Sequence, residues 1–239
     1  MIKNIFILFA TVLFISCQDN KTKQHETENQ QKEKQTENKI KSAEELEKSS
    51  EKSDKIKKIK QEELIPFLEE YGKENLQTKA LIKTEFGEIE VKLFEDTPLH
   101  RANFIYLTNL GYFNTTYFYR VEKDFVIQAG NSDNESTSKM RKSIGSFLIP
   151  KEFKTQHIHK YGTLAAAKYT KQNVSKASSP YEFYIVMNKE GASHLDQEHT
   201  VFGEVIKGME VAEKISAVET GNKSYWPIEN VEIEVEILE

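Results

Sequence analysis

The sequence predicts a mainly β domain that closes, or nearly closes, into an antiparallel barrel with two helices. Many short segments alternate apolar and polar residues, which is the pattern of half-buried strands. The last of them, residues 231–237, alternates strictly. Only two segments of the predicted domain have apolar residues at helical spacing, and many short strands with few helices favour a barrel.

The composition separates the start of the 239-residue chain from the rest. Residues 18–60 hold 12 Lys and 10 Asp plus Glu, with no aromatic residue, Gly or Pro. Such a segment buries too little apolar surface to offset the entropy of the chain, so residues 17–60 are predicted to be a disordered tether. Residues 61–239 hold 20 Lys plus Arg against 28 Asp plus Glu. This acidic balance argues against nucleic acid as a partner, because phosphate binding needs a basic face.

Residues 1–16 are expected to be a secretory signal peptide. Lys3 precedes an apolar run of about twelve residues, whereas a membrane-spanning helix needs about 20. The run ends at Ser16 and Cys17, the only cysteine, and this ending resembles a bacterial lipobox. The resemblance implies cleavage before Cys17, acylation of that residue and anchorage in the bacterial cell envelope, on the periplasmic or cell-surface face. A cleaved signal peptide with an incidental cysteine, or an uncleaved anchor, remains open.

Residues 61–78 are predicted to form a short amphipathic helix and a linker that lead into a domain of residues 79–239. Leu64, Phe67 and Tyr71 recur at roughly helical spacing, with glutamates between them.

The domain is predicted to begin with a hairpin and a helix. Residues 80–84 and 88–94 alternate apolar and polar side chains, and Gly87 lies between them. Thr97 suits the position that caps a helix and Pro98 suits its first turn. Gly208 is predicted to open a second helix. Further strands are predicted at residues 116–121, 125–128, 164–167, 183–187 and 201–205.

Four segments of the domain carry motifs. From Tyr117 to Gly130 the sequence reads Tyr-Phe-Tyr-Arg-Val, three further residues, and Phe-Val-Ile-Gln-Ala-Gly. Residues 149–153, 162–167 and 194–203 carry the other three motifs. In this order, the four segments resemble motifs of the cyclophilins, which are peptidyl-prolyl isomerases. The resemblance covers residues 79–239 and implies a closed eight-stranded antiparallel β-barrel with two capping α-helices, isomerase activity, no cofactor and no metal.

The chemistry of that activity explains the residue types. Rotation about an X–Pro bond breaks amide resonance and faces a barrier of about 18–20 kcal/mol. A catalyst needs no covalent step, but it must bind the twisted amide better than either planar isomer. An apolar slot for the proline ring and a cation for the rearranging amide meet this need. The resemblance implies that Arg120 is the cation, and that Gln128 binds the substrate backbone and helps to hold Arg120.

The resemblance also assigns the remaining site residues. It places Phe125 and His199 in the catalytic set with Arg120 and Gln128. The residues that it implies for substrate binding are Val126, Ala167, Glu182, Tyr184, His194 and Leu195.

Three of these positions depart from the family pattern. Glu182 stands where the family has Gln, and it could favour basic substrates or pair with Arg120. Tyr184 replaces Phe and adds a hydroxyl that needs a partner. His194 replaces a Trp that supports binding of the cyclic peptide cyclosporin, so weak inhibition by cyclosporin is predicted.

Simpler explanations exist for single residues. Taken alone, Arg120 would be a surface charge of a strand. His157 and His159 could form a metal pair, but two histidines without a nearby third ligand seldom hold a metal well.

The expected function is that of a monomeric peptidyl-prolyl isomerase, anchored to the membrane through Cys17, that acts on Pro-containing segments of exported proteins. The alternative is a non-catalytic Pro-peptide-binding or chaperone module of the cell envelope. It would keep the apolar slot but lose turnover, because Glu182 and two loops, residues 131–146 and 170–179, differ from the family pattern beside the groove. A structural envelope lipoprotein would need an extra apolar surface or repeats, and the sequence shows neither.

Overall fold

The computed structural model describes residue 56 and residues 58–169, 173–221 and 224–239. The predicted signal peptide, Cys17 and all but the last few residues of the predicted tether lie outside this part. Within it, no helix is both long enough and apolar enough to cross a membrane.

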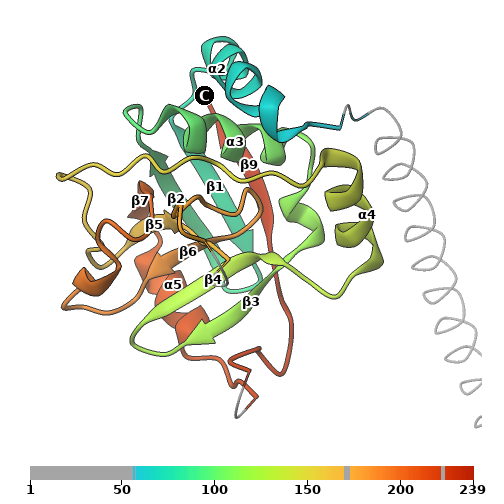
Figure 1. The fold of residues 1–239 in the computed structure, drawn as a ribbon. Helices are drawn as coiled ribbons and strands as arrows, with labels where there is room; N and C mark the ends of the chain where they lie inside the picture. The colour runs from blue at the N-terminus through green and yellow to red at the C-terminus, as the bar shows by residue number, and fades with distance from the viewer. Residues whose placement is uncertain (1–55, 57, 170–172, 222–223) are drawn as a thin grey trace, which may run out of the picture. The chain divides into compact units, whose positions relative to one another are not determined.

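The strands of the described part form one antiparallel sheet (Figure 1). Its order is β8-β3-β4-β6-β5-β7-β2-β1-β9. The strands are β1 (Lys79–Thr84), β2 (Gly87–Leu93), β3 (Tyr117–Glu122), β4 (Val126–Asn131), β5 (Thr163–Ala166), β6 (Phe183–Val186), β7 (Val201–Lys207), β8 (Val231–Glu232) and β9 (Glu234–Leu238).

The C-terminal segment closes the barrel. β8 pairs with β3 and β9 pairs with β1, so adjacent parts of one segment join the two edges of the sheet. Only Ile233 separates them, and its amide donates to the carbonyl of Thr116 at 3.3 Å. The predicted β-barrel is therefore confirmed. The predicted count of eight strands differs from the nine in the part of the chain that the structure describes, because the last strand changes partner and is interrupted at Ile233.

Helices cover the barrel. They are α2 (Leu64–Glu74), α3 (Pro98–Asn109), α4 (Glu135–Ile144) and α5 (Met209–Ser216), with 3-10 turns η1 (Gln61–Glu63), η2 (Phe113–Thr115) and η3 (Ser193–Leu195). α3 packs against α2 and β9, whereas α5 packs against β2, β3 and β4. α2, α3 and α5 were predicted from helical spacing.

The cap of α3 differs from the prediction. The hydroxyl of Thr97 donates to the carbonyl of Phe94 at 3.2 Å instead of accepting from the helix. The carboxylate of Glu152 accepts from the first free amides, those of Leu99 at 3.0 Å and His100 at 2.9 Å. A carboxylate at a helix start satisfies unpaired amides and favours the helix dipole, so a distant residue takes the place of the local cap.

Helix α4 was not predicted, because residues 131–146 were taken for a loop. Its sequence is mostly polar, and only Thr137, Met140 and Ile144 are buried. Three buried residues over ten give a weak helical pattern. The carbonyl of Ile144 accepts from the amide of Ile59 at 2.8 Å, so the segment that enters the domain lies against the end of α4.

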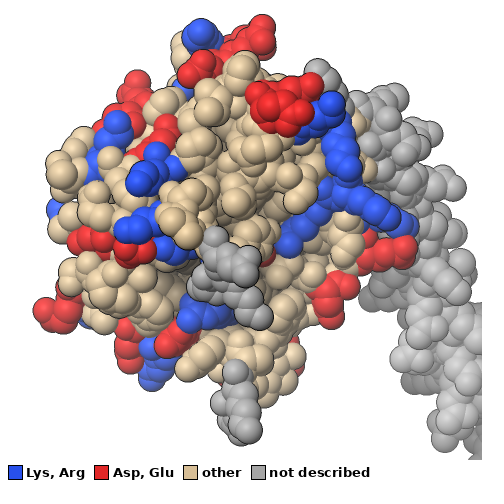
Figure 2. Space-filling model, in the orientation of Figure 1, with Lys and Arg blue, Asp and Glu red and all other residues tan. Residues whose placement is uncertain are grey.

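The core of the barrel is apolar and contains two clusters. The larger cluster fills the barrel, with fully buried side chains that include Phe118, Ile127 and Leu164. A smaller one contains Val126 and Tyr184. On the face shown in Figure 2, acidic and basic side chains lie mainly around the margin, and the middle is largely uncharged.

Candidate functional site

A cavity of about 620 Å³ lies over the smaller apolar cluster. It is lined by Tyr119, Arg120, Phe125, Val126, Gln128, Ala167, Lys168, Tyr169, Glu182, Tyr184, Leu195 and His199. The structure therefore brings together every site residue predicted within the domain except His194. Cys17, the predicted lipidation site, lies outside the described residues.

A β-bulge places two neighbouring residues of β3 on this cavity. In a regular strand, successive side chains point to opposite faces. Here Phe118 pairs with Ala129 and Arg120 pairs with Gln128, so Tyr119 is an extra residue. Such a bulge redirects side chains. Both Tyr119 and Arg120 consequently line the cavity.

Arg120 has three neighbours that orient its guanidinium. Its Nη2 forms an ion pair with the carboxylate of Glu122. Its Cζ lies 5.9 Å from the ring centroid of Phe125 and 5.6 Å from that of Tyr225. The side chain is 30% exposed, so it remains open to a ligand.

Gln128 and Glu182, the two residues considered as partners of Arg120, have other polar partners in the structure. Gln128, its cross-strand neighbour, donates from Nε2 to the hydroxyl of Tyr119 instead. Glu182 does not pair with Arg120, because Arg141 of α4 supplies its partner at 3.1 Å. The sequence could not show this pairing, since it depends on the unpredicted helix.

Apolar side chains form one wall of the cavity. Phe125 and Leu195 pack against the small buried cluster that contains Val126, Ala167 and Tyr184. Ala167 is only 5% exposed, and its small side chain leaves room beside this wall. The five residues make an apolar slot next to Arg120.

His199 contributes an uncharged imidazole to the slot. Burial lowers its pKa to about 4, although a hydrogen bond to the Ala166 carbonyl opposes the effect. The neutral ring donates from Nδ1 to that carbonyl at 3.1 Å. Its ring and that of Tyr184 form an edge-to-face pair, with the centroids 5.6 Å apart.

The hydroxyl of Tyr184 has the partner that the sequence required. It lies 3.0 Å from Nε2 of His159, while Nδ1 of His159 lies 2.8 Å from Asp196. Burial lowers the pKa of His159, with Asp196 opposing. In the neutral ring, Nδ1 donates to Asp196 and Nε2 accepts from Tyr184. This chain of hydrogen bonds fixes the ring of Tyr184 within the wall.

His157 and His159, which the sequence made an unfavourable metal pair, do not share a site. His157 lies 2.8 Å from Asp96, whereas His159 binds Asp196. Among the residues that the structure describes, no group of three or more His, Cys, Asp or Glu side chains could hold a metal ion.

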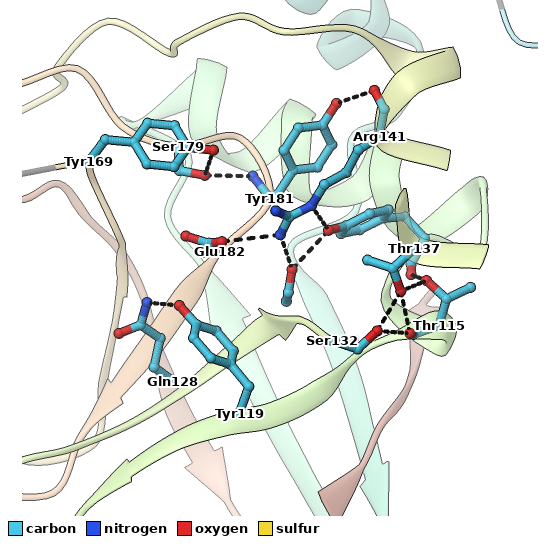
Figure 3. A network of polar contacts seen from close by, with 12 residues as sticks. Thr115, Tyr119, Gln128, Ser132, Thr137, Arg141, Tyr169, Ser179, Tyr181 and Glu182 are labelled. Carbon is cyan, nitrogen blue, oxygen red and sulfur yellow. Dashed lines mark hydrogen bonds and ion pairs between the residues drawn. The ribbon is translucent and has the colours of Figure 1, made fainter. Parts of the chain in front are cut away.

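A polar network lies beside the apolar wall (Figure 3). Arg141 donates from Nη2 to Glu182 at 3.1 Å and to the carbonyl of Gly130 at 2.8 Å. Its Nε donates to the hydroxyl of Tyr112 at 2.7 Å. Burial raises the pKa of Glu182, and Arg141 opposes this effect.

Three further residues line the cavity without having been predicted as site residues: Tyr119, Lys168 and Tyr169. Lys168 and Tyr169 directly follow Ala167, so proximity in the sequence was a usable signal. Tyr119 is revealed only by the bulge. His194, by contrast, does not line the cavity but stacks on Phe125, with ring centroids 5.6 Å apart.

Comparison with known proteins gives a consistent result. The family described as "Cyclophilin type peptidyl-prolyl cis-trans isomerase/CLD" matches residues 79–237. Peptidyl-prolyl cis-trans isomerase-like 2 of Rhizopus delemar is 37% identical over 155 residues, which cover 64% of this chain and 27% of that protein. Peptidylprolyl isomerase domain and WD repeat-containing protein 1 of Homo sapiens is 34% identical over 179 residues, covering 74% and 26%. The chain thus spans about a quarter of the length of these two relatives.

A shorter relative and a solved structure are matched over nearly their whole length by this chain. Peptidyl-prolyl cis-trans isomerase-like 3 of Gallus gallus is 31% identical over 153 residues, which cover 64% of this chain and 90% of that protein. A crystal structure of a cyclophilin type peptidyl-prolyl cis-trans isomerase of Cryptosporidium parvum, in the presence of the dipeptide Ala-Pro, has a TM-score of 0.57 and 24% identity. The match covers 67% of this chain and 99% of that one, and it supports the fold.

Proposed function

Since the chain belongs to the cyclophilin-type peptidyl-prolyl isomerase family, we propose that its barrel domain catalyses cis–trans isomerisation of X–Pro bonds. One observation carries the proposal: a guanidinium that remains open to a ligand lines the same cavity as an apolar slot. This combination suits a proline ring and the amide attached to it.

The catalysis is non-covalent. Twisting the X–Pro amide localises a lone pair on nitrogen, which can then accept a hydrogen bond. Arg120 donates to this developing acceptor and stabilises the twisted amide more than either planar isomer. No proton needs to be transferred.

The slot holds the proline ring during this rotation. Phe125, Val126, Leu195 and Tyr184 provide its apolar surface, and His199 adds an uncharged imidazole. Burial of the ring supplies binding energy without favouring one isomer, and Arg120 supplies the discrimination. Gln128 binds the backbone of the substrate at the edge of the cavity.

The substrates that we propose are Pro-containing segments of exported polypeptides, bound by a monomer. Glu182 already has Arg141 as a partner, so we no longer expect it to select basic substrates. The exported class of substrate rests on residues 1–17 alone, which resemble a signal peptide and lipobox. The relatives named above are eukaryotic and do not support an exported class of substrate.

Anchorage through Cys17 is the corresponding proposal for localisation, in a bacterial cell envelope on the periplasmic or cell-surface face. In bacteria grown with a palmitate analogue, the full chain should become labelled and Cys17→Ser should not. Equal labelling of both would contradict the anchor.

A non-catalytic Pro-peptide-binding module is the second candidate. It is favoured by α4 and the Arg141–Glu182 pair, which occupy the edge of the groove where the family has a different loop. Isomerisation kinetics of a short Ala-Pro-Phe peptide with the full chain separate the two. Faster isomerisation supports the enzyme. Binding of the peptide without any increase in its isomerisation rate supports the second candidate.

A further inference from the structure

We propose that Tyr225 is a positioning residue for Arg120, and that Tyr225 and Trp226, within the segment of residues 224–230, belong to the functional site. The inference rests on the proposed function for its effect on turnover. The ordering of the Arg120 side chain by Tyr225 can be measured without turnover.

The guanidinium of Arg120 needs an external support. A long, partly exposed side chain has many rotamers, and a cation stabilises a transition state best when it is fixed beforehand. The ion pair with Glu122 joins two half-exposed side chains, with 30% and 28% exposure. Pairs of this kind are weak, because water screens them.

Two aromatic rings supply this support. Phe125 lies 5.9 Å and Tyr225 5.6 Å from Cζ of Arg120, both within the range of a cation–π interaction. Phe125 also forms part of the slot, so its position is tied to the cavity. Tyr225 is not among the residues that line the cavity, and its ring contacts the site through Arg120.

The main chain presents the Tyr225 ring to Arg120. The carbonyl of Tyr225 accepts from the amide of Val121 at 2.8 Å, next to Arg120 in β3. β8 pairs only with Tyr117 and Phe118. The Tyr225 carbonyl therefore forms a main-chain hydrogen bond with β3 beyond the residues that pair with β8.

Trp226, the residue after Tyr225, packs against Tyr119, the other residue of the bulge that lines the cavity. The ring of Trp226 lies 5.6 Å from that of Tyr119, and its Nε1 donates to Asn230 at 3.0 Å. Each of the two adjacent β3 residues, Tyr119 and Arg120, thus has one aromatic neighbour from this segment. A bulge disrupts the regular ladder, so packing from outside the sheet replaces part of the lost support.

Main-chain hydrogen bonds hold residues 224–230 against residues 219–221. The amide of Gly221 donates to the carbonyl of Trp226 at 2.9 Å, and that of Ile228 donates to Glu219 at 2.9 Å. Tyr225 has φ of 55°, a left-handed conformation that is uncommon for a residue other than Gly. Tyr225 is 45% exposed. Burial in the core therefore does not explain where its ring lies.

The test compares variants of the full chain. Tyr225→Asn removes the ring, and Asn tolerates a left-handed backbone. Tyr225→Phe retains the ring. Ile228→Ala is the matched control, because Ile228 is 63% exposed in the same segment and is not among the residues around Arg120. Thermal unfolding of each variant checks that the fold is kept, and Tyr225→Leu replaces the Asn variant if that one unfolds.

Two readouts decide. With an Ala-Pro-Phe peptide, Tyr225→Asn should lower kcat by about threefold to tenfold with little change in KM, and Tyr225→Phe and Ile228→Ala should stay within about twofold of the parent. In an Arg120→Ala background, Tyr225→Asn should have no further effect, since the cation that the ring supports is already lost. NMR relaxation of the Arg120 Nε–Hε group should show greater mobility in Tyr225→Asn than in Tyr225→Phe.

The outcomes separate the two proposals. A folded parent without isomerase activity would contradict the proposed function, and the NMR comparison would still decide on Tyr225. Unchanged Arg120 mobility in Tyr225→Asn overturns the positioning role. An equal loss of activity in the Arg120→Ala background also overturns it, because the effect would then not act through the side chain of Arg120.

Discussion

The guanidinium of Arg141 lies 3.1 Å from the carboxylate of Glu182, and this contact links helix α4 to the wall of the cavity. The side chain of Glu182 is only 11% exposed. A buried carboxylate without a partner is costly. We therefore expect Arg141→Met to destabilise the fold by at least about 2 kcal/mol, measured by urea unfolding at neutral pH.

The adjacent residue provides the control for this prediction. Lys142 is exposed on the same helix, so Lys142→Met should change the free energy of unfolding by less than about 0.5 kcal/mol. An equal loss in the free energy of unfolding of both variants would mean that the Arg141–Glu182 pair makes no specific contribution to stability.

Tyr184→Phe separates the ring from its hydroxyl. The variant keeps the aromatic wall, but Nε2 of His159, a residue that is 2% exposed, loses its donor. We expect a loss of about 1–3 kcal/mol in the free energy of unfolding and less than a twofold change in kcat/KM. Tyr161→Phe is the control, because it removes a hydroxyl that donates to Glu213 at the exposed surface. If both variants are equally stable, the bond between Tyr184 and His159 is not formed in solution.

The stability of the domain should rise with pH between about 4 and 6.5. Burial lowers the pKa of His199 from 6.5 to about 4, so in this window the unfolded chain binds more protons than the folded one. His159, whose pKa is also lowered by burial, acts in the same direction. Glu182 acts in the opposite direction just above pH 4.5, because its pKa is raised.

NMR titration of His199 measures this effect without interference from the other groups. We expect its ring signals to shift with a midpoint near pH 4, and His199→Phe to reduce the slope of stability against pH. A midpoint at or above pH 6 would show that the imidazole is charged more easily than its burial implies.

Cyclosporin should inhibit weakly. His194 stacks on Phe125 without lining the cavity, and it stands where many cyclophilins have a Trp that supports cyclosporin binding. The larger indole offers more apolar surface and an N–H donor, so His194→Trp should tighten inhibition by about tenfold or more. Inhibition of the unmodified chain in the low nanomolar range would refute this prediction.

The parts of the fold that follow from local pattern were predictable. The strands alternate because one face is buried, and the helix at residues 98–109 follows from Pro98 and apolar spacing. Helix α4 was missed because its burial rests on only three side chains. The cap from Glu152 was missed because it comes from a segment about fifty residues away.

The same distinction holds for the site. Ordered motifs identified residues such as Arg120 and Gln128 that the structure gathers around one cavity. Their contacts were not predictable, because Arg141 and Tyr225 reach the site from segments without a motif. Pairing of Arg120 with Glu182 was a reasonable expectation from charge alone, and tertiary structure gave each a different partner.

The rate of prolyl isomerisation by the full chain, compared with Arg120→Ala, tests the central claim most directly. The matched control is Lys123→Ala, an exposed cation just beyond β3. Loss of a term worth about 3–4 kcal/mol should lower kcat/KM for an Ala-Pro-Phe peptide by about 10²–10³-fold in Arg120→Ala, with Lys123→Ala unchanged. A folded parent that leaves the peptide at its uncatalysed rate, or an Arg120→Ala variant as fast as the parent, would contradict the account.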